Sequence, residues 1–173
     1  YVYVACDGLK IVDVSDPVHP HVVGQVSTPG VACGVAVEGN FAYVASHWGG
    51  FYIIDVANPF APHIASSFHP PGYPADVELA GNLAFVAAGE YGLAVIDISN
   101  PLQPDMVGGV ETGGGMGVAL AGSLAYLADG LSGFCVIDIS DFTAPEIIAQ
   151  VPAYLIVQDV AAVGSTAFYT DER

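Results

Sequence analysis

Short runs of apolar residues, punctuated by glycine, asparagine and proline, follow one another along the whole chain. The segment FYIIDV at residues 51–56 is almost continuously apolar, whereas VACGVAVEG at residues 31–39 alternates between apolar and small or polar positions. Alternation with period two and short apolar runs between turn residues are both typical of β-strands. Because no helical period interrupts these runs, the pattern predicts an all-β protein.

The pattern returns at a fixed interval. An aspartate lies at the end of each near-continuous run, and these residues are spaced 42, 42 and 41 apart: Asp13, Asp55, Asp97 and Asp138. A fixed period of about 20–50 residues indicates one supersecondary unit stacked on copies of itself. We place the repeat units approximately at residues 1–30 (incomplete), 31–72, 73–112, 113–155 and 156–173 (incomplete).

Each complete unit is predicted to contain four strands, which in the second unit are residues 31–39, 41–46, 51–56 and 63–68. In the third of these, Phe51 and Ile53 point to one side, and Tyr52 and Ile54 to the other. A strand that is apolar on both faces is covered on both faces. A four-stranded antiparallel unit held between two copies of itself is a β-propeller blade. Alanine and glycine concentrate in the first strand, so we expect that strand to lie nearest the axis.

Counting strands along residues 1–173 gives 17, one more than a closed ring of four blades would use. We therefore interpret the chain as a single propeller domain or part of one, and as part of a longer polypeptide. A four-bladed closure with a redundant tail and an open arc are the alternatives.

The third strands and their turns also carry a resemblance. The segments KIVDVSDP, YIIDVANP, AVIDISNP and CVIDISDF resemble the LVIVD repeat, a β-propeller repeat of bacterial and archaeal proteins that are often secreted or at the cell surface. The resemblance implies an extracellular or cell-surface location. It implies no catalytic residues, because the family shares none. The last copy departs from the pattern, since Phe142 replaces the proline of the other three.

The charge balance limits the partners. The chain has 18 acidic residues against two basic ones, which gives a formal net charge of −16. Such an acidic protein repels phosphate, so we expect neither nucleic acid nor an anionic membrane as a partner. No apolar stretch has the length of a membrane span, so we expect no membrane insertion.

The three cysteines, Cys6, Cys33 and Cys135, occupy unrelated positions in the repeat and predict neither a disulfide framework nor a zinc site. We expect all three to be buried as small hydrophobic residues, with one disulfide bridge between Cys6 and Cys33 as the alternative. No serine elbow and no phosphate-binding loop is present, which argues against an enzyme.

The four repeated aspartates precede proline-containing turns. A carboxylate at such a position accepts hydrogen bonds from backbone N–H groups of the turn, so we interpret Asp13, Asp55, Asp97 and Asp138 as structural. Calcium binding beside Asp16 or Asp141 is the alternative, although no calcium loop is present. We therefore expect no cofactor, with calcium as the one possibility.

Two further acidic residues lie in first strands, directly before a repeated valine. Asp76 and Asp159 alternate with glycines at the equivalent positions of the other units. They could line a central channel and hold a cation there. The alternative is that they bond neighbouring backbone N–H groups, because two carboxylates are too few ligands for calcium.

The loops between second and third strands, and those between units, differ from copy to copy, whereas the other turns are uniform. Variable loops on a rigid scaffold are where binding is usually found, although loops also vary when nothing constrains them. The predicted contact residues of this face are His47, Trp48, Tyr73, Glu90, Tyr91 and Asp129.

These observations predict a non-catalytic scaffold that binds a protein or a glycan. One alternative is a cation-dependent hydrolase or lyase with an acidic site in the channel. The other is a purely structural surface or adhesin module.

Overall fold

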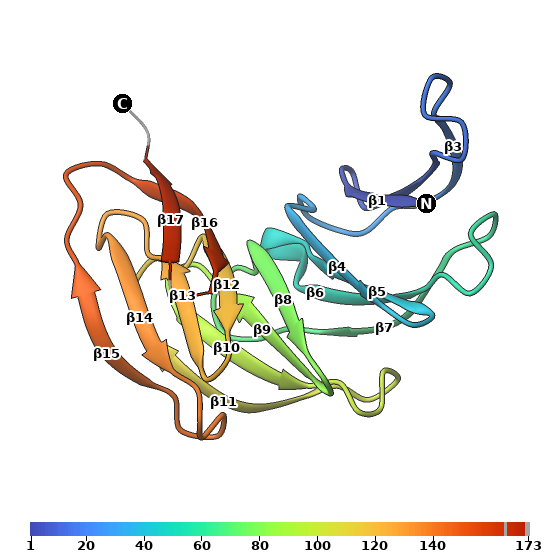
Figure 1. The fold of residues 1–173 in the computed structure, drawn as a ribbon. Coiled ribbons are helices and arrows are strands. Elements are labelled where there is room, and N and C mark those ends of the chain that lie inside the picture. The colour runs from blue at the N-terminus through green and yellow to red at the C-terminus, as the bar shows by residue number, and fades with distance from the viewer. Residues whose placement is uncertain (165, 172–173) are drawn as a thin grey trace.

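The computed structural model describes residues 1–164 and 166–171, and it is all-β apart from one short 3-10 turn, η1 (His47–Gly49). The described residues form 17 strands in five antiparallel sheets (Figure 1). The fold class predicted from the repeat is confirmed.

The strands pair in chain order within every sheet. The first sheet contains β1 (Val2–Ala5), β2 (Leu9–Asp13) and β3 (His21–Val26). The second contains β4 (Gly34–Glu38), β5 (Phe41–Ala45), β6 (Phe51–Asp55) and β7 (His63–Phe68). The third contains β8 (Asp76–Ala80), β9 (Leu83–Ala87), β10 (Gly92–Asp97) and β11 (Asp105–Glu111). The fourth contains β12 (Gly117–Ala121), β13 (Leu124–Ala128), β14 (Phe134–Asp138) and β15 (Glu146–Val151). The fifth contains β16 (Val157–Val163) and β17 (Thr166–Asp171).

Glycine fixes the register of the hairpin that joins first and second strands. Glu38 pairs with Phe41 across the two-residue turn Gly39–Asn40, and Gly39 has φ 57°. A two-residue turn with positive φ at its first position matches the twist of the flanking strands, and glycine adopts that φ without strain. The recurrent glycine of each repeat is therefore a requirement of the turn.

Four clusters of buried side chains join the sheets, and each lies between two neighbours. Phe51 and Ile53 belong to the cluster between the second and third sheets. Tyr52 and Ile54 of the same strand belong to the cluster between the first and second sheets. The prediction that third strands are covered on both faces is confirmed, because each inner sheet contributes to two cores.

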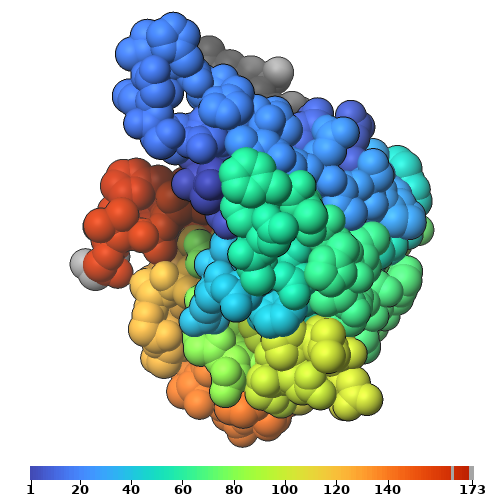
Figure 2. Space-filling view, turned by 90° about the vertical axis from the view of Figure 1, so that its right-hand side faces the viewer, coloured from blue at the N-terminus to red at the C-terminus, as the bar shows by residue number. Residues whose placement is uncertain are grey.

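The first strands of the successive sheets contact one another: β4 contacts β8, β8 contacts β12, and β12 contacts β16. They lie on the inner side of the curved array (Figure 1), as predicted from their small residues. Among the described residues, no core cluster joins the first and last sheets. The structure thus has the form of an open arc of propeller blades, and Figure 2 shows successive repeats following in chain order across one face.

Fourth strands dock on the turn of the next repeat. A β-bulge in β11 places Gly108 opposite Val95, and a Cβ atom added to Gly108 would lie 2.0 Å from the backbone oxygen of Phe142. Gly24 approaches the oxygen of Pro59 in the same way, at 2.0 Å. At the equivalent position of the second sheet, the Ser66 hydroxyl donates a hydrogen bond of 2.5 Å to the oxygen of Pro101. Small residues are required here because neighbouring blades meet at this point.

Replacing Gly108 with alanine is expected to lower the free energy of unfolding by about 1–3 kcal/mol, the usual cost of forcing an extra carbon into a packed site. A glycine-to-alanine change inside a strand otherwise stabilises by about 0.5–1 kcal/mol. Urea denaturation followed by circular dichroism measures the change. A stabilised variant would contradict the close docking of β11 on the next turn.

Candidate functional site

The molecule has two ends of different character. Val56 N–H donates to Asn40 O at 2.8 Å, which ties the end of a third strand to the hairpin between first and second strands. The connections between first and second strands and those between third and fourth strands therefore share one end, here called the turn end. The connections between second and third strands and those between repeats lie at the opposite end, the loop end.

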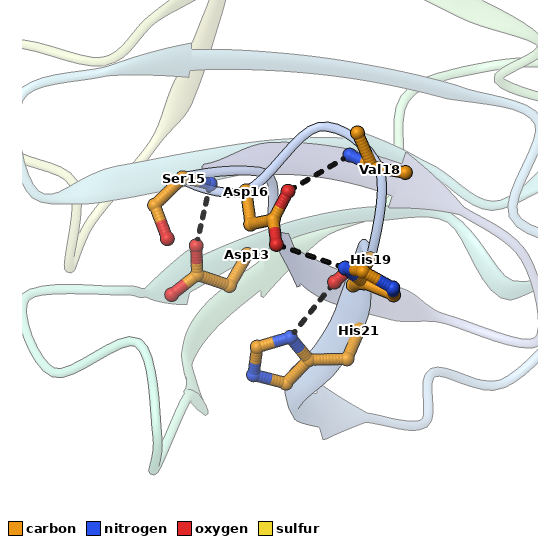
Figure 3. Close-up of polar contacts among 6 residues, drawn as sticks. All are labelled: Asp13, Ser15, Asp16, Val18, His19 and His21. Atoms are coloured by element: carbon orange, nitrogen blue, oxygen red, sulfur yellow. Dashed lines mark hydrogen bonds and ion pairs between the residues drawn. The ribbon is translucent and has the colours of Figure 1, made fainter.

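The repeated aspartates lie at the turn end and cap their own turns. Asp13 accepts a hydrogen bond from the Ser15 N–H at 2.8 Å, and Asp16 accepts one from the Val18 N–H at 3.1 Å (Figure 3). Each of the other repeated aspartates accepts the same hydrogen bond from the N–H two residues further along the chain, with lengths of 2.8–2.9 Å: Asp55, Asp97 and Asp138. These carboxylates thus accept hydrogen bonds from the backbone N–H groups of their turns, as the structural interpretation requires.

Hydrogen bonding also lowers the pKa of four turn carboxylates: Asp13, Asp16, Asp97 and Asp138. The Ser15 N–H lowers the pKa of Asp13, and the Ser99 and Ser140 N–H groups do the same for Asp97 and Asp138. The His19 side chain, whose Nδ1 lies 2.9 Å from Asp16 Oδ2, lowers the pKa of Asp16 (Figure 3). Each carboxylate is thus satisfied within its own turn.

A cavity of about 670 Å³ opens at the loop end. The side chains that line it include five of the residues predicted from the sequence, and they come from both predicted groups: His47, Tyr73, Asp76, Glu90 and Asp159. The structure therefore brings the variable loops and the first-strand carboxylates together in one site.

His47 occupies an unusual position in this site. Its φ is 42°, whereas the equivalent residues of the next two repeats are Gly89 and Gly130, with φ of 54° and 57°. Residues other than glycine are disfavoured in this left-handed region, and those that adopt it cluster at functional sites. The backbone is held there because the His47 N–H donates to Pro74 O at 2.7 Å.

The His47 ring makes two aromatic contacts. It stacks on Tyr73 with ring centres 5.1 Å apart and planes at 7°, and it meets Trp48 edge to face at 5.3 Å. Its Nδ1 atom is buried and has no hydrogen-bond partner among the described residues. Trp48 is 63% exposed beside the cavity, and Tyr73 is 44% exposed. The three rings form an aromatic wall, which we call the 47/48/73 wall.

Asp76 and Asp159 flank the start of β12. Asp76 Oδ2 accepts a hydrogen bond from the Val118 N–H at 3.0 Å, and Asp159 Oδ1 accepts one from the Val160 N–H at 2.8 Å. Burial raises the pKa of Asp76, the N–H groups of Val118 and Val77 oppose this, and the charge of Asp159 raises it further. The two carboxylates thus bond backbone groups, as one of the two sequence interpretations required, and also face the cavity.

Glycines at the positions equivalent to these aspartates make room for them. A Cβ atom on Gly34 would lie 2.7 Å from both the Cα and Oδ1 atoms of Asp76, and one on Gly117 would lie 3.0 Å from the Cα of Asp159. The alternation of glycine and aspartate along the first strands therefore reflects pairwise packing between neighbouring sheets.

Asp129 requires a correction. It was predicted to be a contact residue, yet it has no exposed surface. Its carboxylate accepts hydrogen bonds from the Thr112 hydroxyl, from the Gly114 N–H at 2.9 Å and from the Cys135 thiol at 3.6 Å. Asp129 therefore anchors the glycine-rich connection before β12 instead of reaching a ligand.

Tyr91 lies apart from the cavity lining. It is half-buried and packs on the core cluster between the second and third sheets. Its neighbour Glu90, by contrast, is exposed and lines the cavity.

Several lining residues were missed by sequence reasoning: Cys33, Gly113, Met116, Leu131 and Gln158. All come from connections or first-strand ends at the loop end. Two isolated β-bridges, Gly89 with Gly115 and Gly130 with Val157, hold these connections against one another. The sequence signal that could have identified them is that their residue types differ from those at the equivalent positions of the other repeats, as for His47.

The burial predicted for the cysteines is wrong for two of the three. All are free thiols, and Cys6 and Cys33 are exposed, while Cys135 is buried. Burial, together with the nearby Asp129, raises the pKa of Cys135 to about 12, so its thiol stays protonated and can donate to that carboxylate. Cys6 directly follows β1 and Cys33 directly precedes β4. Both therefore lie in connections at the loop end, outside the packed faces of the sheets.

The described residues lack both a metal-binding cluster and a helical membrane span. No group of three or more His, Cys, Asp or Glu side chains is placed to hold a metal ion. The one helical element there is too short to cross a membrane, so no helical span is found.

The LVIVD repeat matches residues 1–28, 29–69, 71–112 and 113–153. No curated protein matches the chain.

Among solved structures, the computationally designed Ika4 protein is 12% identical with a TM-score of 0.65, over 86% of this chain and 93% of that one. A functionally unknown protein from Desulfotomaculum acetoxidans is 16% identical with a TM-score of 0.69, over 84% and 50%. The β-propeller domain of Cps50 (Swd1) from Myceliophteria thermophila is 14% identical with a TM-score of 0.68, over 90% and 56%. The chain thus spans most of the first structure and about half of the other two, and these similarities concern the fold.

Proposed function

Because the chain belongs to the LVIVD repeat family and folds as consecutive propeller blades, we propose that it is a non-catalytic binding scaffold located outside the cytoplasm or at the cell surface. The recognition surface is the cavity at the loop end together with the 47/48/73 wall. The partner is a protein or a glycan.

One observation carries the proposal: the cavity is lined by residues that differ between repeats, and they come from successive repeats. His47, Tyr73, Glu90, Leu131 and Gln158 are examples. Recurrent side chains build the blades and their turns, so non-recurrent ones that converge on a cavity are free to serve recognition. The cavity volume of about 670 Å³ also lies within the range of about 300–1,000 Å³ typical of binding sites.

The chemistry of the wall supports these partner classes. Tyr73 and Trp48 are 44% and 63% exposed, and aromatic side chains are enriched in protein contact surfaces. The net charge of −16 disfavours nucleic acid. The acidic composition and the family resemblance support the extracellular location.

The arrangement of side chains gives no support to a cation-dependent hydrolase. Among the described residues, no three His, Cys, Asp or Glu side chains lie close enough together to hold a metal ion. A purely structural module leaves the strained His47 and its stacked ring without a role. The binding function accounts for both.

The test uses a variant that the chain itself suggests. His47→Gly installs the residue that the next two repeats have at this position, so we expect its free energy of unfolding to stay within about 1 kcal/mol of wild type, since relief of the left-handed backbone offsets the lost stacking. Labelled protein is applied to a glycan array and to a displayed peptide library. Ligands selected on the wild type are expected to bind about tenfold or more weakly to His47→Gly and Tyr73→Ala, the size of effect typical of aromatic contact residues.

Phe60→Ala is the matched control, since Phe60 is 65% exposed in a proline-containing turn at the turn end. The control should bind like wild type. Ligands that bind all variants equally, or an absence of ligands in both libraries, would contradict the proposal.

A further inference from the structure

The charge of the cavity is one-sided. Asp76, Glu90 and Asp159 line it, and Lys10, the one basic residue among those that the structure describes, is not among the lining residues. Lys10 instead lies near Cys6, with its Nζ 3.9 Å from the thiol sulfur. The carboxylates of the cavity therefore have no cationic partner among the described residues. A cleft lined by one sign of charge attracts ligands of the opposite sign.

Apolar and aromatic side chains accompany these carboxylates. Met116, Leu131 and Ile156 line the same cavity, and the stacked ring of Tyr73 exposes part of its surface there. Aromatic faces attract cations that approach within about 6 Å of the ring centre. The alkyl stems of basic groups pack well on apolar surface while their charged heads remain near polar groups.

This combination suits an organic cation better than a metal ion. Asp76 and Asp159 each give one oxygen to a backbone N–H, so few carboxylate oxygens remain for coordination. Calcium requires about six to eight oxygen ligands. A guanidinium or ammonium group needs only one or two acceptors, and it gains from the rings and apolar residues that a metal ion cannot use.

We propose that the cavity at the loop end binds an organic cation, the guanidinium or ammonium group of a basic peptide or of a free polyamine. The charged group lies between Asp76 and Asp159, its alkyl chain lies along Met116 and Leu131, and Tyr73 covers one side. This assignment rests on the proposed binding function for its site, and with the free polyamine it goes beyond the protein and glycan partners proposed there.

The electrostatic state of the site agrees with this assignment. Burial and the charge of Asp159 raise the pKa of Asp76, so the ionised pair is costly without a positive charge nearby. A bound cation offsets that cost. The net charge of −16 also favours encounter with cations at low salt.

Trp48 provides the readout. It is the only tryptophan of the chain, it is 63% exposed, and it contacts the His47 ring that lines the cavity. Its fluorescence, checked by isothermal titration calorimetry, is followed while three probes are added. These are the blocked tripeptide acetyl-Gly-Arg-Gly-amide, spermidine, and the neutral acetyl-Gly-Gln-Gly-amide.

We expect at least one cationic probe to bind about tenfold or more tightly than the neutral peptide, as a desolvated charge pair allows. Binding of the arginine peptide alone identifies a peptide source, and binding of spermidine alone identifies a free amine. Binding of both supports the shared chemistry. Equal binding of the neutral peptide, or no binding of either cation, overturns the inference.

The variants separate the site from general charge. The double change Asp76→Asn with Asp159→Asn is expected to weaken cation binding about tenfold or more, since each carboxylate loses its charge but keeps an oxygen for its backbone bond. The control, Asp16→Asn with Asp141→Asn, removes the same charge at the turn end. Equal weakening by the two pairs overturns the inference. If the double variant fails to fold, the single changes Asp76→Asn and Asp159→Asn serve as the test, and unchanged cation binding by both then overturns the inference.

The outcome also separates this inference from the proposed function. If His47→Gly weakens binding of the array-selected ligands while neither cation binds, the scaffold function stands and only the ligand class is wrong. If the selected ligands bind the loop-end variants His47→Gly and Tyr73→Ala as tightly as wild type, the proposed function itself fails.

Discussion

Replacing Phe85 with alanine is expected to lower the free energy of unfolding by about 3–5 kcal/mol, the usual cost of truncating a buried phenylalanine. Phe85 is 2% exposed and belongs to the cluster between the third and fourth sheets. Its ring packs in a core shared by two repeats, so the cavity left behind weakens both sheets. Urea or thermal denaturation followed by circular dichroism measures the loss.

Phe60→Ala is again the matched control, because it makes the same chemical change at a residue that is 65% exposed. It should change stability by no more than about 0.5 kcal/mol, as exposed substitutions usually do. A loss for Phe85→Ala as small as that of the control would mean that the sheets do not pack face to face as described.

Replacing Asp129 with alanine is expected to cost about 2–4 kcal/mol, since it leaves the Thr112 hydroxyl and the Gly114 N–H without their acceptor in a buried site. The glycine-rich connection that these bonds hold also lines the cavity through Gly113 and Met116. We therefore expect ligand binding at the loop end to weaken together with stability. Denaturation curves and the Trp48 titration measure the two effects.

Asp129→Asn separates the acceptor from the charge. Its amide oxygen can still accept from Thr112 and Gly114, so the loss should be smaller than for alanine, by about 1 kcal/mol or more. Equal losses for the two variants would show that the carboxylate's hydrogen bonds do not anchor this connection.

Much of the fold could be predicted because its determinants are local or periodic. The repeated run ending at Asp55 implies stacked sheets, and the opposite directions of Ile53 and Ile54 imply a core on both sides. The turn bonds of Asp13 and Asp16 span two residues each, so the residue types alone determine them. The confirmed architecture follows from such short-range rules.

The site could be predicted only in part. The sequence distinguished recurrent from variable positions, and His47, Tyr73, Asp76, Glu90 and Asp159 all came from that comparison. It treated the loops and the first strands as separate candidates, because nothing in the chain states how far apart they lie. The same reasoning placed Asp129 at the surface, since a loop position carries no signal of burial.

The sequence by itself determined the repeat, its strands, the double-sided core and the capped turns, because those depend on neighbours within a strand or a few residues along the chain. The tertiary structure alone decided that His47 stacks on Tyr73, that Asp76 accepts a hydrogen bond from the Val118 N–H 42 residues away, and that Asp129 is buried and accepts a hydrogen bond from the Thr112 hydroxyl. These contacts join different repeats, so they depend on the spacing and rotation between neighbouring sheets. That geometry is set by packing across the whole array and is not encoded in any single segment.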